Sequence, residues 1–340
     1  MSHESVRQHV LTTGKVLEQL GRETAAQPQE AASHKPKFVF LEVDGIHCHL
    51  QRRGRKGKKN AEVRVMYVHE GWEEHPDRKD RFTAKNLYIR HWSPDKDDLE
   101  DLAGELCNRY GIDNNTVVVV CGDRAGWIRK AVDYFGDSTV LYQVDRFHIL
   151  RDIRMIFRAN PEGHGRVISA IDSDPTGGRF MATVAEELAK LPSAERQKAQ
   201  GLINDLIPIA DCIGDYRIRL QAMGIDTQGL RSVGATESRN SLFTARLKGY
   251  KKSWSVCGLK AMMHTLAAKF EGSLHELLHT LYKQTGPLPG EERLKREALR
   301  TALENLAAPV VVRTGNIPLR GAGIVRSGGL SRLFRDIVTA

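Results

Sequence analysis

Residues 116–145, TVVVVCGDRAGWIRKAVDYFGDSTVLYQVD, predict two buried strands with a helix between them. The runs TVVVVCGD (116–123) and TVLYQVD (139–145) are continuous and rich in β-branched or apolar side chains, as in strands that are covered on both faces of a parallel sheet. Parallel neighbours need a crossover connection, and the segment at about 125–135 supplies a helix for it. We therefore expect an α/β fold.

Three further strand-like segments precede this unit with only short links between them. They are KFVFLEVD (37–44), VRVMYVHE (63–70) and NLYIRHW (86–92). Short β-rich segments joined by turns favour an antiparallel meander. Together with the two later strands they predict a mixed five-stranded sheet, flanked by a helix that begins after Ser93 and by another at 147–158.

The rest of the chain is predicted to be mostly helical. Helical patterns occupy residues 1–23, 160–230, 236–249, 258–272 and 290–306. The expected division is an N-terminal helix and linker (1–36), the first part of a sheet-containing core (37–159), a helical segment (160–230), the C-terminal helices of the core (231–283), and a helix with a basic tail (284–340).

The charge balance favours an anionic partner. Lys and Arg exceed Asp and Glu by 51 to 42, a net charge of +9, and such a surplus favours nucleic acid before a membrane surface. The N-terminus lacks the apolar segment of a signal peptide and no long apolar run occurs, so a cytoplasmic location is expected. The five cysteines form no C-x-x-C pair, which argues against a structural zinc site.

Two aspartates are placed where predicted strands end. Asp44 ends the first strand and Asp123 ends the fourth. Ligands of α/β sheets gather beyond the carboxyl ends of strands, so both carboxylates face one crevice if these strands are neighbours. Carboxylate oxygens suit hard cations such as Mg²⁺ or Mn²⁺. Turn capping is the alternative interpretation of either aspartate.

A third carboxylate lies on a predicted helix in GATESRNSLFTARLKGYKK (234–252). Thr236 can cap this helix, and Glu237 lies in its first turn. With about 3.6 residues per turn, one polar face is formed by Glu237, Asn240, Ser241, Thr244 and Lys248. Such a face is unusual for a helix that is only solvated, although a capped surface helix is the alternative.

The sequence resembles bacterial insertion-sequence transposases of the ISLre family, which belong with the Mutator-like DDE enzymes of RNase H-like fold. The resemblance runs from about Lys37 to Met263 and rests on five motifs in order. They are LEVDGIHCHL, VMYVHEGW, VVVVCGDRAGWIRKA, VLYQVDRFHILRDI, and GATESRNS with the RLK and KSWS that follow it. The resemblance implies an RNase H-like core in which 160–230 is a helical insertion before the last catalytic helix.

The same resemblance implies that Asp44, Asp123 and Glu237 are the catalytic residues and the metal ligands. The expected activity is metal-dependent DNA strand cleavage and strand transfer at the ends of an insertion sequence. Two Mg²⁺ or Mn²⁺ ions about 3.5–4 Å apart can serve both ends of an in-line displacement. The implied partners are double-stranded DNA, both element ends and target, and further copies of the chain within the DNA complex, at the nucleoid.

Two features depart from the family pattern. Only about 36 residues precede the first strand, where family members usually carry a longer N-terminal part. This is expected of a truncated or variant copy. Arg124 also stands where a small residue is commoner after the second aspartate.

Four residues are predicted to assist the three carboxylates. Asp145 and His148 follow the fifth strand, and His148 is expected to contact the scissile phosphate or position water, or else to be satisfied at a strand–helix junction. Arg239 and Asn240 are expected to orient Glu237 or to meet the DNA backbone.

Basic residues beside the first strand and the Glu237 helix are predicted to contact DNA phosphates. The loop QRRGRKGKKN (51–60) is flexible and basic, and Trp254 either stacks on an extruded base or belongs to the core. The basic residues are Arg52, Arg53, Arg55, Lys56, Lys58, Lys59, Lys248, Lys251 and Lys252.

Two other functions remain open. The pair His148-x-x-Arg151 is compatible with a tyrosine-type recombinase, but the next tyrosine is Tyr216. A non-catalytic DNA-binding remnant of a transposase is the other alternative, against which the three carboxylates argue. Sensitivity to EDTA separates the two enzymes, because covalent tyrosine chemistry needs no metal.

Overall fold

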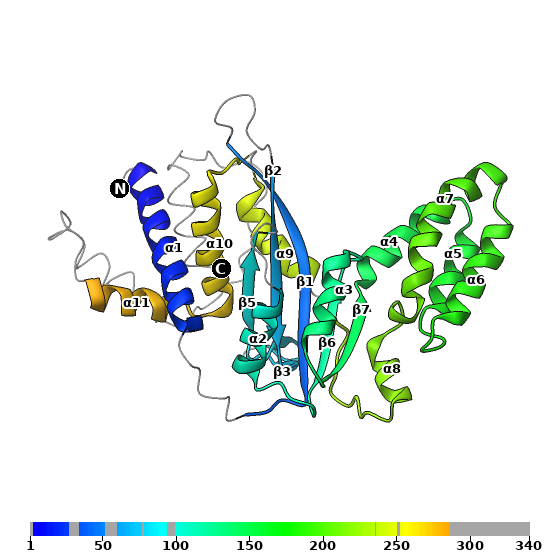
Figure 1. The fold of residues 1–340 in the computed structure, drawn as a ribbon. Helices are drawn as coiled ribbons and strands as arrows, with labels where there is room; N and C mark the ends of the chain where they lie inside the picture. The colour runs from blue at the N-terminus through cyan, green and yellow to red at the C-terminus, as the bar shows by residue number, and fades with distance from the viewer. Residues whose placement is uncertain are drawn as a thin grey trace.

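The fold is a mixed five-stranded sheet with helices on both faces (Figure 1), as predicted. The structure, a computed structural model, describes residues 3–26, 34–51, 60–76, 78–93, 99–234, 236–249 and 252–285 of the 340. No helix in these ranges is long and apolar enough to cross a membrane.

The sheet joins an antiparallel meander to a parallel unit, in the order β5-β2-β1-β6-β7. The strands are β1 (Phe38–His49), β2 (Asn60–His69), β5 (Tyr88–Trp92), β6 (Val117–Gly122) and β7 (Thr139–Val144). β1 pairs with β2, and β2 with β5, in antiparallel fashion. β6 pairs in parallel with both β1 and β7. Both halves were predicted from the strand patterns.

The first strand is longer than predicted. β1 continues past Asp44 to His49, because its pairing with β2 extends to His49 opposite Asn60. Its pairing with β6 ends earlier, at Val43 opposite Gly122. Asp44 therefore lies inside β1 but directly beyond the parallel part of the sheet.

The helices follow the predicted pattern over most of the described chain. They are α1 (His3–Ala26), α2 (Leu99–Tyr110), α3 (Gly126–Ala131), α4 (Arg146–Ile156), α5 (Pro161–Ala170), α6 (Gly178–Ala189), α7 (Ser193–Leu206), α8 (Tyr216–Ala222), α9 (Thr236–Leu247), α10 (Val256–Glu271) and α11 (Leu274–Thr285). The hairpin of β3 (Trp72–Glu74) and β4 (Phe82–Ala84), and helix α11, were not predicted. The helix predicted at 290–306 lies outside the described residues.

Both faces of the sheet are buried, each under a different set of helices. Val43 of β1 belongs to a core that includes residues of α2, α3 and α4. Ile46 and Cys48 of the same strand point the other way and pack with residues of α9 and α10. This double burial explains why the central strands are nearly continuous apolar runs.

Helices α5–α7 form a helical lobe beside the sheet, joined to it by α4 (Figure 1). The chain leaves the sheet on the face that α4 covers. It returns on the opposite face, where Tyr216 and Leu220 of α8 pack with Phe40 and Val119. The lobe therefore carries the chain from one face to the other before α9 begins.

Helix α1 packs closely against α10 at the edge of the molecule (Figure 1). A Cβ at Gly14 would lie 2.3 Å from Ala261 Cα, so only glycine permits this approach.

Candidate functional site

Asp44 and Asp123 lie side by side where β1 and β6 stop pairing. The last parallel pair is Val43 with Gly122, so the next residue on each strand is an aspartate. Gly122 leaves no room for a side chain, because a Cβ there would lie 2.7 Å from Ile128 Cδ1 and 3.0 Å from Val43 O. Both aspartates are half-buried, and their charges interact. The structure thus brings together the two aspartates that the sequence singled out.

The buried amide of Asn240 links α9 to Asp44. Asn240 Nδ2 donates to Asp44 Oδ2, and Tyr67 O–H donates to Asn240 Oδ1 at 2.6 Å. The Gly45 N–H donates to Asp44 Oδ1 at 2.7 Å. Burial raises the pKa of Asp44, although the hydrogen bonds from Gly45 and Asn240 act to lower it. The Asp123 carboxylate adds to the rise. Asp44 is therefore a carboxylate whose negative charge is only partly compensated by the protein.

Asp123 is held by the loop that it begins. Ala125 N–H donates to Asp123 Oδ1 at 2.9 Å, which is the turn-capping contact expected of an aspartate here. Tyr142 O–H of β7 donates to the Asp123 carbonyl. The next residue, Arg124, forms an ion pair at 2.6 Å with the buried Asp152 of α4, which gives this unusual arginine a structural role. Capping engages one oxygen of Asp123, and the charge of this carboxylate still interacts with Asp44.

Asp145 and His148 lie at the start of α4, beside the two aspartates. Asp145 N–H donates to the Gly122 carbonyl at 2.7 Å, and Asp145 Oδ1 caps α4 by accepting from Phe147 N–H at 2.9 Å. His148 Nδ1 lies 3.1 Å from Asp145 Oδ2. This hydrogen bond raises the pKa of His148 against the effect of burial, and Asp44 contributes in the same direction. The arrangement therefore favours a protonated histidine next to the paired carboxylates.

Glu42, which the sequence interpretation missed, is a fully buried carboxylate on the same face of β1 as Asp44. Its Oε1 lies 3.1 Å from His69 Nε2 and 3.3 Å from Arg239 Nη1. Its Oε2 accepts from Gly234 N–H at 3.0 Å. Burial acts to raise the pKa of Glu42, but the His69 hydrogen bond and the Arg239 charge outweigh it, so the pKa is lowered. Glu42 is therefore a charged group inside the core.

This buried network fixes the start of α9 to the sheet. Gly234 has a φ of 105°, a conformation that side chains rarely permit, and it precedes α9. Arg239 lies in the helix itself, so Glu42 holds the chain on both sides of Glu237. The sequence carried one signal, a single acid within the apolar run FVFLEV (38–43). It carried none for the partners, of which Arg239 is 197 residues away.

The backbone of α9 places Glu237 in its first turn, three residues before Asn240. The Glu237 side chain lies outside the described part of the structure, so its place beside Asp44 and Asp123 stays a prediction. The predicted polar face of α9 is divided, because Asn240 is buried against β1 whereas Ser241 is exposed.

Arg239 and Asn240 bond Glu42 and Asp44, and so they join α9 to the sheet. That they orient Glu237 or meet the DNA backbone stays a prediction. Trp254 is half-buried and packs against the core, where its indole N–H donates to the Leu247 carbonyl at 2.8 Å and its backbone pairs with the end of β1.

The predicted basic contacts are described only in part. Lys248 is exposed at the end of α9, and Lys252 Nζ donates to the Arg246 carbonyl at 2.9 Å. The other predicted contacts lie outside the described residues: Arg52, Arg53, Arg55, Lys56, Lys58, Lys59 and Lys251.

Two of the three carboxylates that were expected to hold a divalent cation are among the described side chains. Among the described side chains, no group of three or more His, Cys, Asp or Glu residues is arranged to hold a metal ion. Asp44 and Asp123 supply two adjacent carboxylates whose mutual repulsion a cation would relieve. The third ligand expected from the sequence is Glu237, whose carboxylate is not among the described groups.

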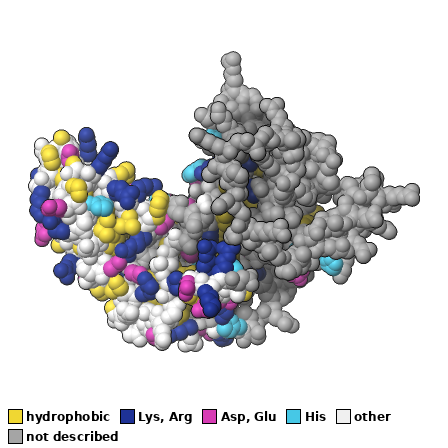
Figure 2. All heavy atoms as spheres, turned by 180° about the vertical axis from the view of Figure 1, so that it is seen from behind, with side chains coloured by type: hydrophobic (Ala, Val, Ile, Leu, Met, Phe, Trp, Pro, Cys, Tyr) yellow, Lys and Arg dark blue, Asp and Glu magenta, His cyan; other side chains and the backbone are white. Residues whose placement is uncertain are grey.

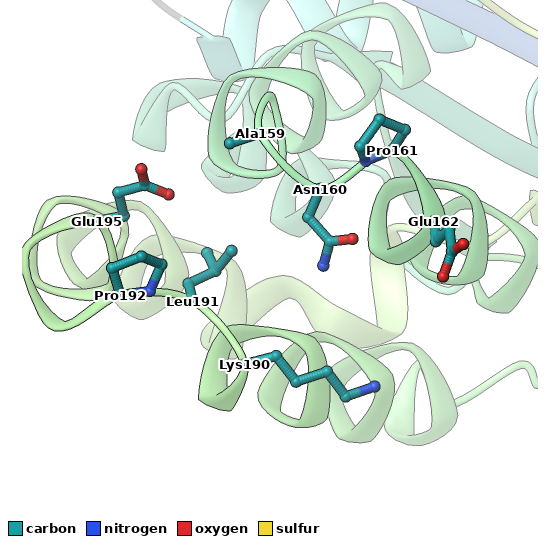
Figure 3. Close-up of a pocket in the computed structure, with 8 residues that line it drawn as sticks. All are labelled: Ala159, Asn160, Pro161, Glu162, Lys190, Leu191, Pro192 and Glu195. Atoms are coloured by element: carbon teal, nitrogen blue, oxygen red, sulfur yellow. The ribbon is translucent and has the colours of Figure 1, made fainter.

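A cavity of about 660 Å³ lies in the helical lobe, apart from the paired aspartates. It opens between the turn before α5 and the turn after α6, and Figure 3 shows Asn160, Lys190 and Glu195 around it. Asn160 caps α5 through Gly163 N–H, and Lys190 pairs with Glu187 at 2.6 Å. These two polar groups therefore serve the packing of the lobe.

The fold and the site define an α/β protein with paired carboxylates where the inner strands β1 and β6 of a mixed sheet stop pairing. The chain belongs to the family described as Uncharacterised protein family (UPF0236), whose model matches residues 1–282. No curated protein matches the sequence significantly. Among solved structures, the Drosophila P element transposase strand transfer complex is matched at 10% identity and a TM-score of 0.22, over 81% of this chain and 72% of that chain. A TM-score this low does not establish a shared fold.

Proposed function

We propose that this chain is a DDE transposase that cleaves and transfers DNA strands at the ends of an insertion sequence. The observation that carries the proposal is the placement of Asp44 and Asp123 on adjacent parallel strands, with α9 held over Asp44 by Asn240. The strand order β5-β2-β1-β6-β7, an antiparallel meander continued by two parallel strands, supports the RNase H-like core that the sequence motifs imply. In this interpretation α5–α8 are an insertion before the catalytic helix α9, as the sequence motifs imply.

Asp44, Asp123 and Glu237 would hold two Mg²⁺ or Mn²⁺ ions. Divalent cations bound in this way activate the attacking oxygen and stabilise the leaving oxygen of a phosphodiester. Asn240 keeps the Asp44 carboxylate in one orientation, because its own amide is fixed by Tyr67. The hydrogen bond with Asp145 raises the pKa of His148, so a protonated His148 would supply positive charge near Asp44.

The tyrosine recombinase alternative finds no support in Tyr142, which precedes its motif, or in Tyr216, the next tyrosine after it. Tyr142 is buried, its O–H is engaged by the Asp123 carbonyl, and burial raises its pKa. Tyr216 is also buried, burial raises its pKa, and its O–H donates to the Arg231 carbonyl at 2.6 Å. Neither phenol is available as a nucleophile.

The test is nicking of a labelled duplex that contains the DNA segments flanking the gene for this chain. The unsubstituted protein should cut with Mg²⁺ or Mn²⁺ and should not cut with EDTA. Asp44→Asn, Asp123→Asn and Glu237→Gln should each abolish cutting and leave duplex binding nearly intact. An amide keeps the shape of the side chain but removes the charge that holds a divalent cation.

Two further variants serve as controls for this test. Asp145→Asn should retain part of the activity, because Asp145 acts through His148 and the cap of α4. Asp113→Asn should retain all of it, since Asp113 pairs with Lys35 before β6, at the other end of that strand. Cutting that persists in EDTA, or normal cutting by Glu237→Gln, would overturn the proposal. Metal-independent DNA binding without any cutting would favour the non-catalytic remnant.

A further inference from the structure

One face of α4 is exposed along its length, and its side chains are basic and apolar. The α4 stripe, as we name it, consists of Phe147, Arg151, Arg154 and Met155 of α4, and Arg158 of the turn that follows. These residues recur at helical spacing and are all exposed. The opposite face of α4 carries Ile149, Asp152 and Ile153, which are buried.

The apolar members of the stripe are unusually exposed. Phe147 is 50% exposed and Met155 is 61% exposed. The Phe147 ring lies edge-on against the His148 ring, with centroids 5.6 Å apart. An aromatic ring at this position, beside a histidine of the candidate site, is suited to stacking on the base of an unpaired nucleotide.

The basic members of the stripe leave positive charge at the surface. Arg154 and Arg158 form no ion pair within the part of the chain that the structure describes. Arg151 shares the buried Asp152 with Arg124. Guanidinium groups match the geometry of phosphate oxygens, so the stripe complements a phosphodiester backbone.

The stripe leads away from the paired aspartates. It begins beside His148, and at about 1.5 Å per helical residue it extends roughly 16 Å to Arg158. Helix α4 points from the sheet toward the helical lobe (Figure 1). Lys and Arg side chains are spread over the visible face of that lobe and gather beside it near the centre of the view (Figure 2).

We infer that the α4 stripe binds single-stranded DNA next to the phosphodiester at the Asp44–Asp123 site. Phe147 stacks on an unpaired base, and Arg154 and Arg158 contact the phosphates of the same strand. This inference rests on the proposed function, because it supplies a path for the strand that the site cuts. It gives α4 a second role beyond connecting the sheet to the lobe.

The first experiment compares a blunt flanking duplex with the same duplex carrying an unpaired tail. Phe147→Ala should weaken binding of the tailed DNA by roughly 5- to 150-fold, the loss of one stacked base, and should leave the blunt duplex unaffected. Phe147→Trp should restore binding of the tailed DNA. Its added fluorescence should be quenched by the tailed DNA alone.

The second experiment measures the salt dependence of tailed-DNA binding. Arg154→Ala with Arg158→Ala should reduce the slope of log affinity against log salt by up to about 1.4, since each lost contact to a single strand accounts for about 0.7. Arg78→Ala with Lys79→Ala is the matched control. Both residues are exposed, and their replacement removes the same charge as the α4 substitutions. They lie between β3 and β4, beyond the end of β2 that pairs with the start of β1.

The outcomes separate this inference from the proposed function. If the α4 variants bind tailed DNA like the control while the protein still cuts through its carboxylates, the inference alone is overturned. If the unsubstituted protein neither binds nor cuts the flanking DNA, the proposed function fails and the inference fails with it. Selective loss on tailed DNA, with rescue by Phe147→Trp, supports both.

Discussion

At the scale of single residues, burial decides how the polar groups of this chain titrate. His91 of β5 is almost fully buried, and its ring meets the ring of His264 on α10 at 4.3 Å. Burial lowers the pKa of His91 well below its ordinary value, and the neighbouring His264, Arg90 and Lys260 act in the same direction. The folded chain therefore keeps His91 neutral well into the acidic range.

His91→Phe should flatten the loss of stability in acid. The unfolded chain binds the His91 proton at its ordinary pKa, about 6.5, whereas the folded chain binds it only at a much lower pH. In the unsubstituted chain, the protonation of His91 therefore leaves the free energy of unfolding unaffected above about pH 6.5. Below that pH it lowers this free energy by up to about 1.4 kcal/mol per pH unit. Urea titrations from pH 8 to 5 measure this slope, with the exposed His47→Phe as control. Equal acid slopes for the His91→Phe and unsubstituted chains would contradict the assignment.

At the scale of elements, a buried charge network joins α9 to the sheet. Glu42 of β1 reaches Gly234 before α9 and Arg239 within it. Apolar packing of Phe243 and Leu247 against the sheet holds the later turns of α9. The turn of α9 that contains Glu237 is thus positioned by polar contacts, which are directional. The later turns of α9 are positioned by apolar burial, which has no direction.

Glu42→Ala should loosen the start of α9 more than any other helix. It leaves Arg239 without this buried partner, and removing one member of a buried pair costs about 3–5 kcal/mol. Glu42→Gln keeps a hydrogen-bonding group of the same size and should recover part of that loss. Amide hydrogen exchange should accelerate in α9 and stay nearly unchanged in α2, on the opposite face. An even acceleration across both helices would show that Glu42 serves the core as a whole.

At the scale of the whole molecule, the chain carries a net charge of +9, whereas the candidate site is built from acidic side chains. Carboxylates repel a phosphodiester, so the DNA binding that we propose would be driven by basic groups elsewhere on the surface. Residues 51–60 hold six Lys or Arg side chains between β1 and β2. We predict that they supply much of this attraction.

Replacing Arg52, Arg53, Lys58 and Lys59 by Ala should weaken binding of any duplex sequence to a similar degree. Contacts to phosphates release counterions, so the slope of log affinity against log salt should fall by up to about 3–4 units. Filter binding at several salt concentrations, on two unrelated duplexes, measures it. A slope that matches that of the unsubstituted chain would mean that the loop makes no phosphate contacts.

The sequence by itself determined the strands and helices that follow from the pattern of side chains within one segment. The β-branched runs at β6 and β7 predicted buried parallel strands, and helical periodicity predicted α4, α9 and α10, because side-chain spacing along one segment fixes which face is apolar. It also singled out Asp44 and Asp123, although β1 continues past Asp44 to His49. The short strands β3 and β4 escaped prediction, since three residues are too few to show a period.

Only the tertiary structure decided which groups meet. Asn240 bonds Asp44 across 196 residues of sequence, and Arg239 reaches Glu42 across 197. Sequence patterns carry no information on such pairs, because the geometry of each depends on how β1, β6 and α9 pack together. The same packing buries one side of α4 and leaves the other exposed, although both sides carry apolar residues. The chain thus specifies its strands and helices locally, and its site by contacts between segments that are far apart in sequence.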